Sequence, residues 1–261
     1  MMAGTCLVSR ATEEIVVVSS LLMRGLFVGF LAGFLAFGFG KVFAEPQIDK
    51  AIAVETQIDM AKGEMPGPEI VSRHTQSTIG LLTGVVVYCS SFGGLFALVF
   101  AYANGRVGRI GPRGLAALLA LAGYIAINVV PDLKYPANPP SVGHPDTIKM
   151  RTEMFFMMVL ISIAAMAFAV NVCQKTYRRL GIWNAALLSG LVFIVVVSIA
   201  QSLLPDINEV PDALPAVVLW RFRIASLGTQ LVLWTTLGVG FGWLTERALE
   251  KQYRFIRPAV S

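Results

Sequence analysis

Apolar residues run along this chain in six long stretches that are separated by shorter polar segments. A helix that crosses a bilayer needs roughly 20 mostly apolar residues, and the stretches approach or exceed that length. The pattern therefore predicts an all-α fold, a polytopic integral membrane protein with six transmembrane helices. We place these helices near residues 25–44, 79–103, 115–130, 154–172, 185–204 and 224–244.

Three of the apolar stretches stop at a proline beside an acidic residue. The stops are Glu45-Pro46, Pro131-Asp132 and Pro205-Asp206, and a proline-rich polar segment follows each of them. This recurrence predicts three related helical hairpins with chemically similar loops, all on one face of the membrane. The hairpins are expected near residues 25–103, 115–172 and 185–244, within a single transmembrane domain that spans residues 23–261.

Composition supports the membrane assignment. Hydrophobic residues make up 56% of the chain and charged residues only 14%, whereas a soluble domain carries about a quarter charged residues. The mean hydropathy is +0.69. Of the 21 basic and 16 acidic residues, Lys41 alone falls inside a predicted span, and there its amine is expected to reach the lipid headgroups.

The positions of the basic residues predict the orientation. The segments 104–114 and 173–184 each carry three basic residues and no acid. Because lysine and arginine in short loops stay in the cytoplasm, both termini are expected there, and the proline-acid loops on the outer face of the cell's inner membrane. The sequence pI of 9.3 then reflects topology, and no basic run suggests a nucleic-acid partner.

Near the N-terminus the stretch ATEEIVVVSSLLM, residues 11–23, is apolar but too short to span, and it contains two glutamates. These acids argue against a signal peptide. We expect residues 1–22 to be an N-terminal extension that is disordered or that results from a start codon assigned too early, since Met23-Arg24 directly precedes the first span.

The first outward loop contains a predicted helix. Residues 46–62 read as a short amphipathic helix with Pro46 in its first turn. Its apolar stripe also carries an acid, Glu55, and Asp59 lies one turn further along the same side. The stripe is formed by Ile48, Ala51, Ile52 and Ile58.

Glycines recur at helical spacing in the first and last spans. Small residues let helix backbones approach closely in lipid, so these glycines predict packing seams rather than a conduction path lined by backbone. They are Gly25, Gly29 and Gly33 in the first span and Gly238, Gly240 and Gly242 in the last.

Polar side chains are scarce inside the spans. Asn128 and Gln201 sit three and four residues before the two Pro-Asp stops. An amide in lipid commonly forms a hydrogen bond with a neighbouring helix, and the alternative is that these two amides line a cation pathway.

Three unusual strings resemble one known family. EPQIDKAIAVE follows the first glycine-rich span, SRxTQxxxGL leads into the second, and NPPSVGxPDTIxxRT lies in the second outward loop. Together these strings are similar to CbtA, a family of proposed cobalt-transporter subunits. The resemblance implies a multi-pass prokaryotic membrane protein that carries cobalt for cobalamin synthesis. It also implies a small histidine-containing membrane partner that is CbtB-like.

Transport of a divalent cation needs oxygen or imidazole ligands that can replace its hydration shell. The outward loops supply such groups, although none has the spacing of an established metal motif. An alternative is that the two histidines are incidental and that the Pro-Asp turns only end a span. The candidate metal residues are Glu45, Asp49, Glu55, Asp59, His74, Asp132, His144, Asp146 and Asp206.

Arginines precede the second, fourth and sixth spans on the same side as these acids. Arg73, Arg151 and either Arg221 or Arg223 are expected to pair with the acid of their own or the neighbouring hairpin. Such pairs would lock the loops together, and they would also neutralise the carboxylates that a cation needs.

The sequence contains no Walker loop, nucleophile elbow, HExxH string or Rossmann glycine pattern. We therefore expect no enzyme activity and no tightly bound cofactor. The leading hypothesis is a transporter component for a divalent transition-metal cation, with cobalt as substrate. The alternative is a non-transporting membrane scaffold or assembly protein for a small partner. A homo-oligomer is left open.

Overall fold

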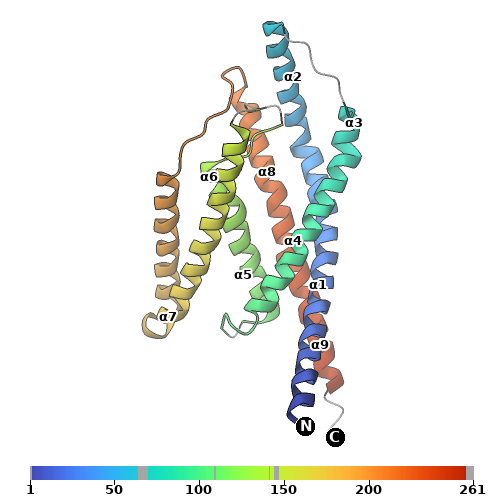
Figure 1. Ribbon diagram of the computed structural model, residues 1–261, viewed down its shortest axis with the longest axis vertical. Coiled ribbons are helices and arrows are strands. Elements are labelled where there is room, and N and C mark those ends of the chain that lie inside the picture. The colour runs from blue at the N-terminus through green and yellow to red at the C-terminus, as the bar shows by residue number, and fades with distance from the viewer. Residues whose placement is uncertain (1, 64–69, 109, 141, 144–146, 257–261) are drawn as a thin grey trace. The chain divides into compact units, whose positions relative to one another are not determined.

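The computed structural model describes residues 2–63, 70–108, 110–140, 142–143 and 147–256, and within them it contains helices and no strand. Figure 1 shows how these helices follow one another along the chain. The α-helices are α1 (Met2–Phe43), α2 (Glu45–Lys62), α3 (Arg73–Thr75), α4 (Leu81–Ala103), α5 (Pro112–Tyr124), α6 (Val130–Lys134), α7 (Ile148–Leu203), α8 (Ala216–Thr236) and α9 (Gly242–Ile256). Three π-helical turns connect some of them: η1 (Gln76–Gly80), η2 (Ile125–Val129) and η3 (Leu237–Phe241).

Five helical stretches of the described chain are long and apolar enough to cross a membrane. One of them, α7, is reversed at Gly181, whose φ of 75° and ψ of 162° are not helical, so its two arms run antiparallel (Figure 1). Each arm is longer than the roughly 20 residues that a bilayer crossing needs. When the two arms of α7 are counted separately, the described chain has six candidate spans, the number predicted. The five stretches are Val18–Phe43, Arg73–Ala103, Pro112–Lys134, Ile148–Leu203 and Ala216–Glu250.

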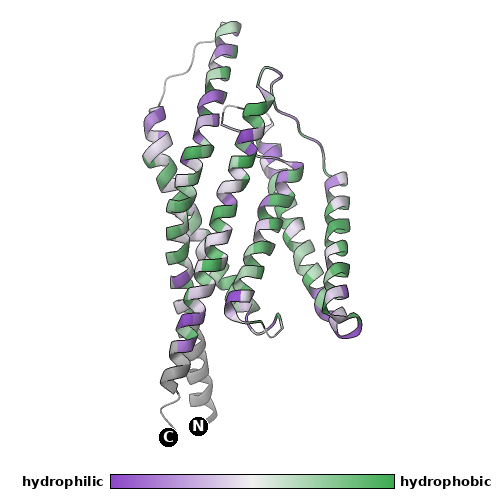
Figure 2. Cartoon of the chain, turned by 180° about the vertical axis from the view of Figure 1, so that it is seen from behind, coloured by the Kyte–Doolittle hydropathy of each residue, from purple (hydrophilic) through white to green (hydrophobic). Residues whose placement is uncertain are grey.

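The distribution of hydropathy agrees with a multi-pass membrane protein. The long middles of the helices are hydrophobic, and hydrophilic residues gather at the turn of α7 and at the connection from α4 to α5 (Figure 2). The all-α membrane fold is therefore confirmed. The three hairpin repeats remain a prediction.

The chain divides into two compact units. Unit 1 comprises residues 1–37, 78–121 and 231–261, and unit 2 comprises residues 38–77 and 122–230. The division falls inside α1, η1, α5 and α8 rather than in linkers, so these elements continue from one unit into the other.

In unit 1 the predicted glycine seams are present. A β-carbon at Gly25 would overlap the carbonyl oxygen of Gly93 on α4, and one at Gly33 would lie 2.7 Å from the α-carbon of Val86. A second seam joins η3 and α9 to α5, where a β-carbon at Gly238 would lie 2.8 Å from that of Ala120. Because water is not there to drive apolar surfaces together in lipid, such close backbone approach is a main source of helix association.

Aromatic rings fill the space beside these seams. Phe96 of α4 meets Phe241 of η3 edge to face, with ring centroids 5.4 Å apart, and Phe100 meets the same ring at 5.0 Å. Phe100 and Phe241 are fully buried. In unit 1, large buried aromatic rings thus lie beside the helices that glycines allow to approach closely.

In unit 2 the two arms of α7 pack with α6. Val130, Tyr135, Met158, Ala165 and Val197 form one buried cluster. Met158 and Ala165 come from the first arm and Val197 from the second. The cluster therefore joins α6 and the residue that follows it to both arms of the α7 hairpin.

The predicted helix stop at Pro131 is wrong. The helix runs on to Lys134, because the π-helical turn η2 precedes the proline and the Val130 N–H bonds Ile125 O, five residues back. The wider turn accommodates a residue that lacks an N–H donor and would otherwise clash with the preceding turn. Asp132 consequently belongs to the last helical turn and not to a loop.

The other two stops differ from each other. At Pro205 the prediction is confirmed, since α7 ends at Leu203 and Leu204 is extended. At Glu45-Pro46 only Ala44 separates α1 from α2, so a helix and not a loop follows the stop. The predicted helix over residues 46–62 is confirmed, with Pro46 in its first turn.

The glycine seam can be tested by comparing two glycines of α4. Gly93→Ala would push α4 away from Gly25 of α1, and we expect it to lower the free energy of unfolding by roughly 1–3 kcal/mol. Thermal unfolding in detergent, followed by circular dichroism, measures the change.

Gly84→Ala is the matched control, because nothing lies within 4 Å of a β-carbon at that position. Alanine favours a helix by about 1 kcal/mol over glycine, so this variant should be as stable as the parent or more so. Equal losses in the two variants would contradict the seam.

Candidate functional site

All three proline-acid segments belong to unit 2. Two of them are in direct contact. The hydroxyl of Tyr135 donates to Pro205 O at 2.8 Å, and Lys134 pairs with Asp206. Burial, the largest cause, raises the pKa of Tyr135; the charge of Lys134 lowers it and that of Asp206 raises it. The phenol therefore stays protonated and remains a hydrogen-bond donor.

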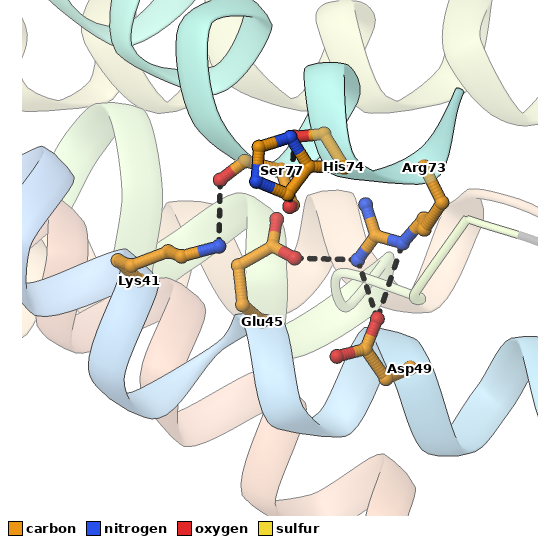
Figure 3. Close-up of polar contacts among 6 residues, drawn as sticks. All are labelled: Lys41, Glu45, Asp49, Arg73, His74 and Ser77. Carbon is orange, nitrogen blue, oxygen red and sulfur yellow. Dashed lines mark hydrogen bonds and ion pairs between the residues drawn. The ribbon is translucent and has the colours of Figure 1, made fainter. Parts of the chain in front are cut away.

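On α2, two acids converge on one arginine. Nη2 of Arg73 binds a carboxylate oxygen of Glu45 and lies 2.9 Å from Oδ1 of Asp49, while its Nε lies 3.1 Å from the same Oδ1 (Figure 3). Glu45 and Asp49 are four residues apart on a helix, so their side chains share a face. We name Glu45, Asp49 and Arg73 the α2 clamp.

The local sequence explains where the arginine sits. Ser72 caps α3, with its Oγ accepting a hydrogen bond from Thr75 N at 3.3 Å. This cap starts the helix at Arg73 and turns its side chain toward α2. The Glu45 side chain is only 7% exposed and that of Asp49 is 64% exposed, so the clamp is a nearly buried ion pair with a second, solvated acid.

Lys41 makes a hydrogen bond within the protein, and its contact with lipid headgroups stays a prediction. Its Nζ donates to Ser77 O in η1 at 2.8 Å (Figure 3). The lysine of the neighbouring helix thus supplies a donor to a backbone carbonyl of this π-helical turn. His74 follows Arg73 and is exposed.

A second charged network links the other two segments. Nη1 of Arg151 lies 3.2 Å from Oε2 of Glu209, and its Nη2 donates to Pro136 O. Arg223 donates to Ala137 O at 3.3 Å and to Asn138 Oδ1 at 3.0 Å. The two arginines therefore fasten the proline-rich segment after Tyr135.

The predicted pairing of arginines with acids is confirmed in part. Arg73 binds Glu45, the acid of its own hairpin, as expected. Arg151 binds Glu209, which the sequence did not single out as a metal candidate, and Asp206 is held by Lys134.

Two amides, Asn128 and Gln201, were predicted inside the spans. Gln201 Nε2 donates to Val130 O at 3.1 Å, so it bonds a neighbouring helix, which was one of the two predictions for it. Asn128 lies within η2 and is 8% exposed. Both amides therefore lie at the proline-containing turn before Asp132.

The predicted metal residues do not form one cluster. Across the described ranges, no group of three His, Cys, Asp or Glu side chains is placed to hold a metal ion. Glu45 and Asp49 come together in the α2 clamp, while Glu55 and Asp59 lie further along α2 and are half-buried. His144 and Asp146 lie outside the described residues.

Comparison with known families gives a clear result. The family described as "Probable cobalt transporter subunit (CbtA)" matches residues 18–246. The chain therefore belongs to the CbtA family, which confirms the resemblance seen in the three loop strings. This is a transporter family and not an enzyme family, in agreement with the absence of catalytic motifs from the sequence. No curated protein and no solved structure shows significant similarity to the chain.

The α2 clamp makes a prediction about stability. Arg73→Gln would leave Glu45 as a nearly buried, unpaired charge, and we expect a loss of about 3 kcal/mol, as for other broken buried pairs. Adding Glu45→Gln to that variant should recover part of the loss, because the uncompensated charge is then removed. Thermal unfolding of the purified single and double variants measures both effects.

Asp49→Asn serves as the control within the same clamp. Since this acid is mostly solvated, its pairing should contribute no more than about 1 kcal/mol. A double variant less stable than Arg73→Gln alone would argue against the burial of an unpaired carboxylate as the cause.

Proposed function

We propose that this CbtA-family protein carries cobalt, as the divalent cation, across the inner (cytoplasmic) membrane into the cell, where it would serve cobalamin synthesis. The observation that supports this most is that all three acid-bearing segments fall in one compact unit, two of them joined by charged contacts. Acids concentrated in this way raise the local concentration of a cation at the membrane surface.

In this proposal the acids face outward, and both termini and the basic segments face the cytoplasm. The three hairpins act as related repeats that surround the path of the ion. Oxygen and imidazole groups of the outer segments would bind the ion in succession: Glu45, Asp49, Glu55, Asp59, His74, Asp132, His144, Asp146 and Asp206.

The path would then pass the turn that contains Asn128 and Gln201. Gln201 Nε2 already donates a hydrogen bond to Val130 O. An ion that binds at this turn would have to break that hydrogen bond. Several acids are already paired with basic side chains: Arg73 pairs with Glu45 and Asp49, and Lys134 pairs with Asp206. An ion that binds one of these carboxylates would have to displace its arginine or lysine. Such exchange keeps binding weak enough for the ion to leave.

The family is described as part of a larger transporter, and we propose a small histidine-containing membrane protein, similar to CbtB, as its partner. A second candidate function is a scaffold for that partner which moves no ion. The ion pairs favour it, because the acids of the α2 clamp and Asp206 already have basic partners that give them a structural role.

Cobalt flux into proteoliposomes separates the two functions. Glu55→Gln and Asp132→Asn should each lower initial cobalt uptake severalfold when external cobalt is limiting, because each removes a carboxylate from the outer face. The assay is run with and without the small partner, and at equal amounts of reconstituted protein. Glu250→Gln, an exposed acid of α9, is the control that should change nothing.

If neither preparation moves cobalt, the scaffold is supported and transport is not. If Glu55→Gln and Asp132→Asn behave as the parent does, the outer carboxylates are not on the path of the ion.

The proposed orientation has its own test. In a cysteine-free background, Asp212→Cys should react with a membrane-impermeant maleimide added to intact cells, and Asn104→Cys should react only after the cells are opened. Both positions are exposed in the structure. Labelling of Asn104→Cys in intact cells would reverse the assignment of the two faces.

A further inference from the structure

The reversal of α7 carries large apolar side chains that the protein does not cover. We call residues 175–184 the α7 tip. The two arms meet at one glycine, Gly181, whose φ of 75° favours a residue without a β-carbon, so no loop separates them (Figure 1). Just beyond it, Ile182 is 76% exposed and Trp183 is 74% exposed. Neighbouring exposed apolar side chains of this size mark a surface that contacts a membrane or a partner.

Three basic side chains accompany these apolar residues. Lys175, Arg178 and Arg179 are exposed, and the α7 tip contains no acid. None of the three forms an ion pair with another described residue. The guanidinium of Arg178 lies over the ring of Tyr177, 5.9 Å from its centroid, and its Nε donates to the tyrosine hydroxyl at 3.2 Å. The α7 tip therefore presents three positive charges that no described carboxylate neutralises.

The length of the second arm determines the depth of the α7 tip in a bilayer. Residues 182–203 form about 33 Å of helix at 1.5 Å per residue, close to the roughly 30 Å of the hydrocarbon core. An arm of this length brings Ile182 and Trp183 to the level where acyl chains meet headgroups. Tryptophan is enriched at that level, and the bases of the last turns of the first arm then lie among the lipid phosphates.

The pairing of an arginine with an aromatic ring recurs at two other helix ends. The guanidinium carbon of Arg106 lies 4.7 Å from the ring centroid of Tyr102 in α4, and that of Arg247 lies 4.0 Å from the ring centroid of Trp243 in α9. Both pairs adjoin segments that the sequence predicts on the same face of the membrane as the α7 tip. Rings and bases at one level are typical of the membrane interface.

The helix dipole alone does not explain this composition. Basic residues at the end of the first arm would be stabilising near its carboxyl-terminal carbonyl groups. That effect gives no reason for Ile182 and Trp183 to be exposed. A bilayer surface with negative charge accounts for both features, because its phosphates match the bases and its acyl chains match the apolar side chains.

We propose that the α7 tip is a binding site for an anionic phospholipid. The lipid phosphate accepts hydrogen bonds from Lys175, Arg178 and Arg179, and Ile182 and Trp183 lie against the upper part of its acyl chains. Arginine suits this role, because its guanidinium can donate two parallel hydrogen bonds to a phosphate. The site uses no residue of the proposed cation path, so it stands or falls independently of cobalt transport.

Fluorescence of Trp183 tests the proposal. The full-length protein is reconstituted in phosphatidylcholine vesicles that contain an increasing fraction of brominated phosphatidylglycerol, or of brominated phosphatidylcholine. Bromine quenches a tryptophan that touches the acyl chains, and the contribution of Trp183 is the difference from Trp183→Phe in the same background. Phosphatidylglycerol should quench at a severalfold lower fraction than phosphatidylcholine, since one base near an anionic surface contributes about a fivefold factor in binding. Added salt should reduce this preference.

Two triple variants separate the bases of the α7 tip from net charge. Lys175→Gln/Arg178→Gln/Arg179→Gln should lose the preference and keep the quenching by phosphatidylcholine. Lys50→Gln/Lys62→Gln/Lys149→Gln is the matched control, because it removes the same charge from exposed bases of α2 and of the other end of α7. It should keep the preference of the parent, and an equal loss in both variants would overturn the proposal.

Three further results would also overturn it. Absence of quenching of Trp183 by either lipid would place the α7 tip away from the bilayer and leave its apolar residues to a protein partner. Equal quenching by the two lipids would show that the bases do not select an anionic headgroup. A fluorescence change on adding inorganic phosphate, lost in the first triple variant and without any preference between lipids, would assign the bases to a soluble anion.

Discussion

The structure of unit 2 depends on keeping charges paired where little water can reach them. Ionised side chains lose hydration near a bilayer, and a partner of opposite charge must replace what is lost. Arg73 does this for Glu45 and Arg151 does it for Glu209, and both acids are almost completely buried. Asp49 and Asp206 are more solvated, so their pairs contribute less to stability and more to position.

The same requirement extends to the backbone. Where a helix departs from regular hydrogen bonding in lipid, its freed carbonyl groups need other donors. Lys41 supplies one to Ser77 O in η1, and Gln201 supplies one to Val130 O next to η2. Side chains from neighbouring helices therefore support η1 and η2, and they tie each of these two turns to a particular neighbour.

Much of the fold could be predicted from the sequence because hydrophobic length and glycine spacing are local signals. The spans, the helix after Glu45 and the seam through Gly25 and Gly33 all follow from them. The stop at Pro131 could not be predicted, since a proline ends a helix unless a wider turn precedes it, and no residue pattern announces η2. The reversal at Gly181 is carried by a glycine that resembles many others in the chain.

The candidate site was predicted less well, because it depends on contacts between distant segments. The sequence placed acids and arginines on one face but could not choose partners, so the pair of Arg151 with Glu209, 58 residues away, was missed. Lys134 lies 72 residues from Asp206, and no local rule links them.

If this protein carries a divalent cation as proposed, these pairings change how the ion would bind. If the acids were unpaired, the proline-acid segments would bind any divalent ion by charge alone, and the ion would be slow to leave. A basic side chain is paired with each of four acids, Glu45, Asp49, Asp206 and Glu209. The binding free energy of an ion at such an acid is therefore only the difference between the interaction of the ion and that of the arginine or lysine it displaces. That difference favours ions with strong preferences for oxygen and nitrogen ligands over weakly coordinating ones. The same ion pairs that stabilise unit 2 would therefore set the selectivity of the proposed path, and a variant that frees an acid would gain affinity for divalent ions and discriminate less between them.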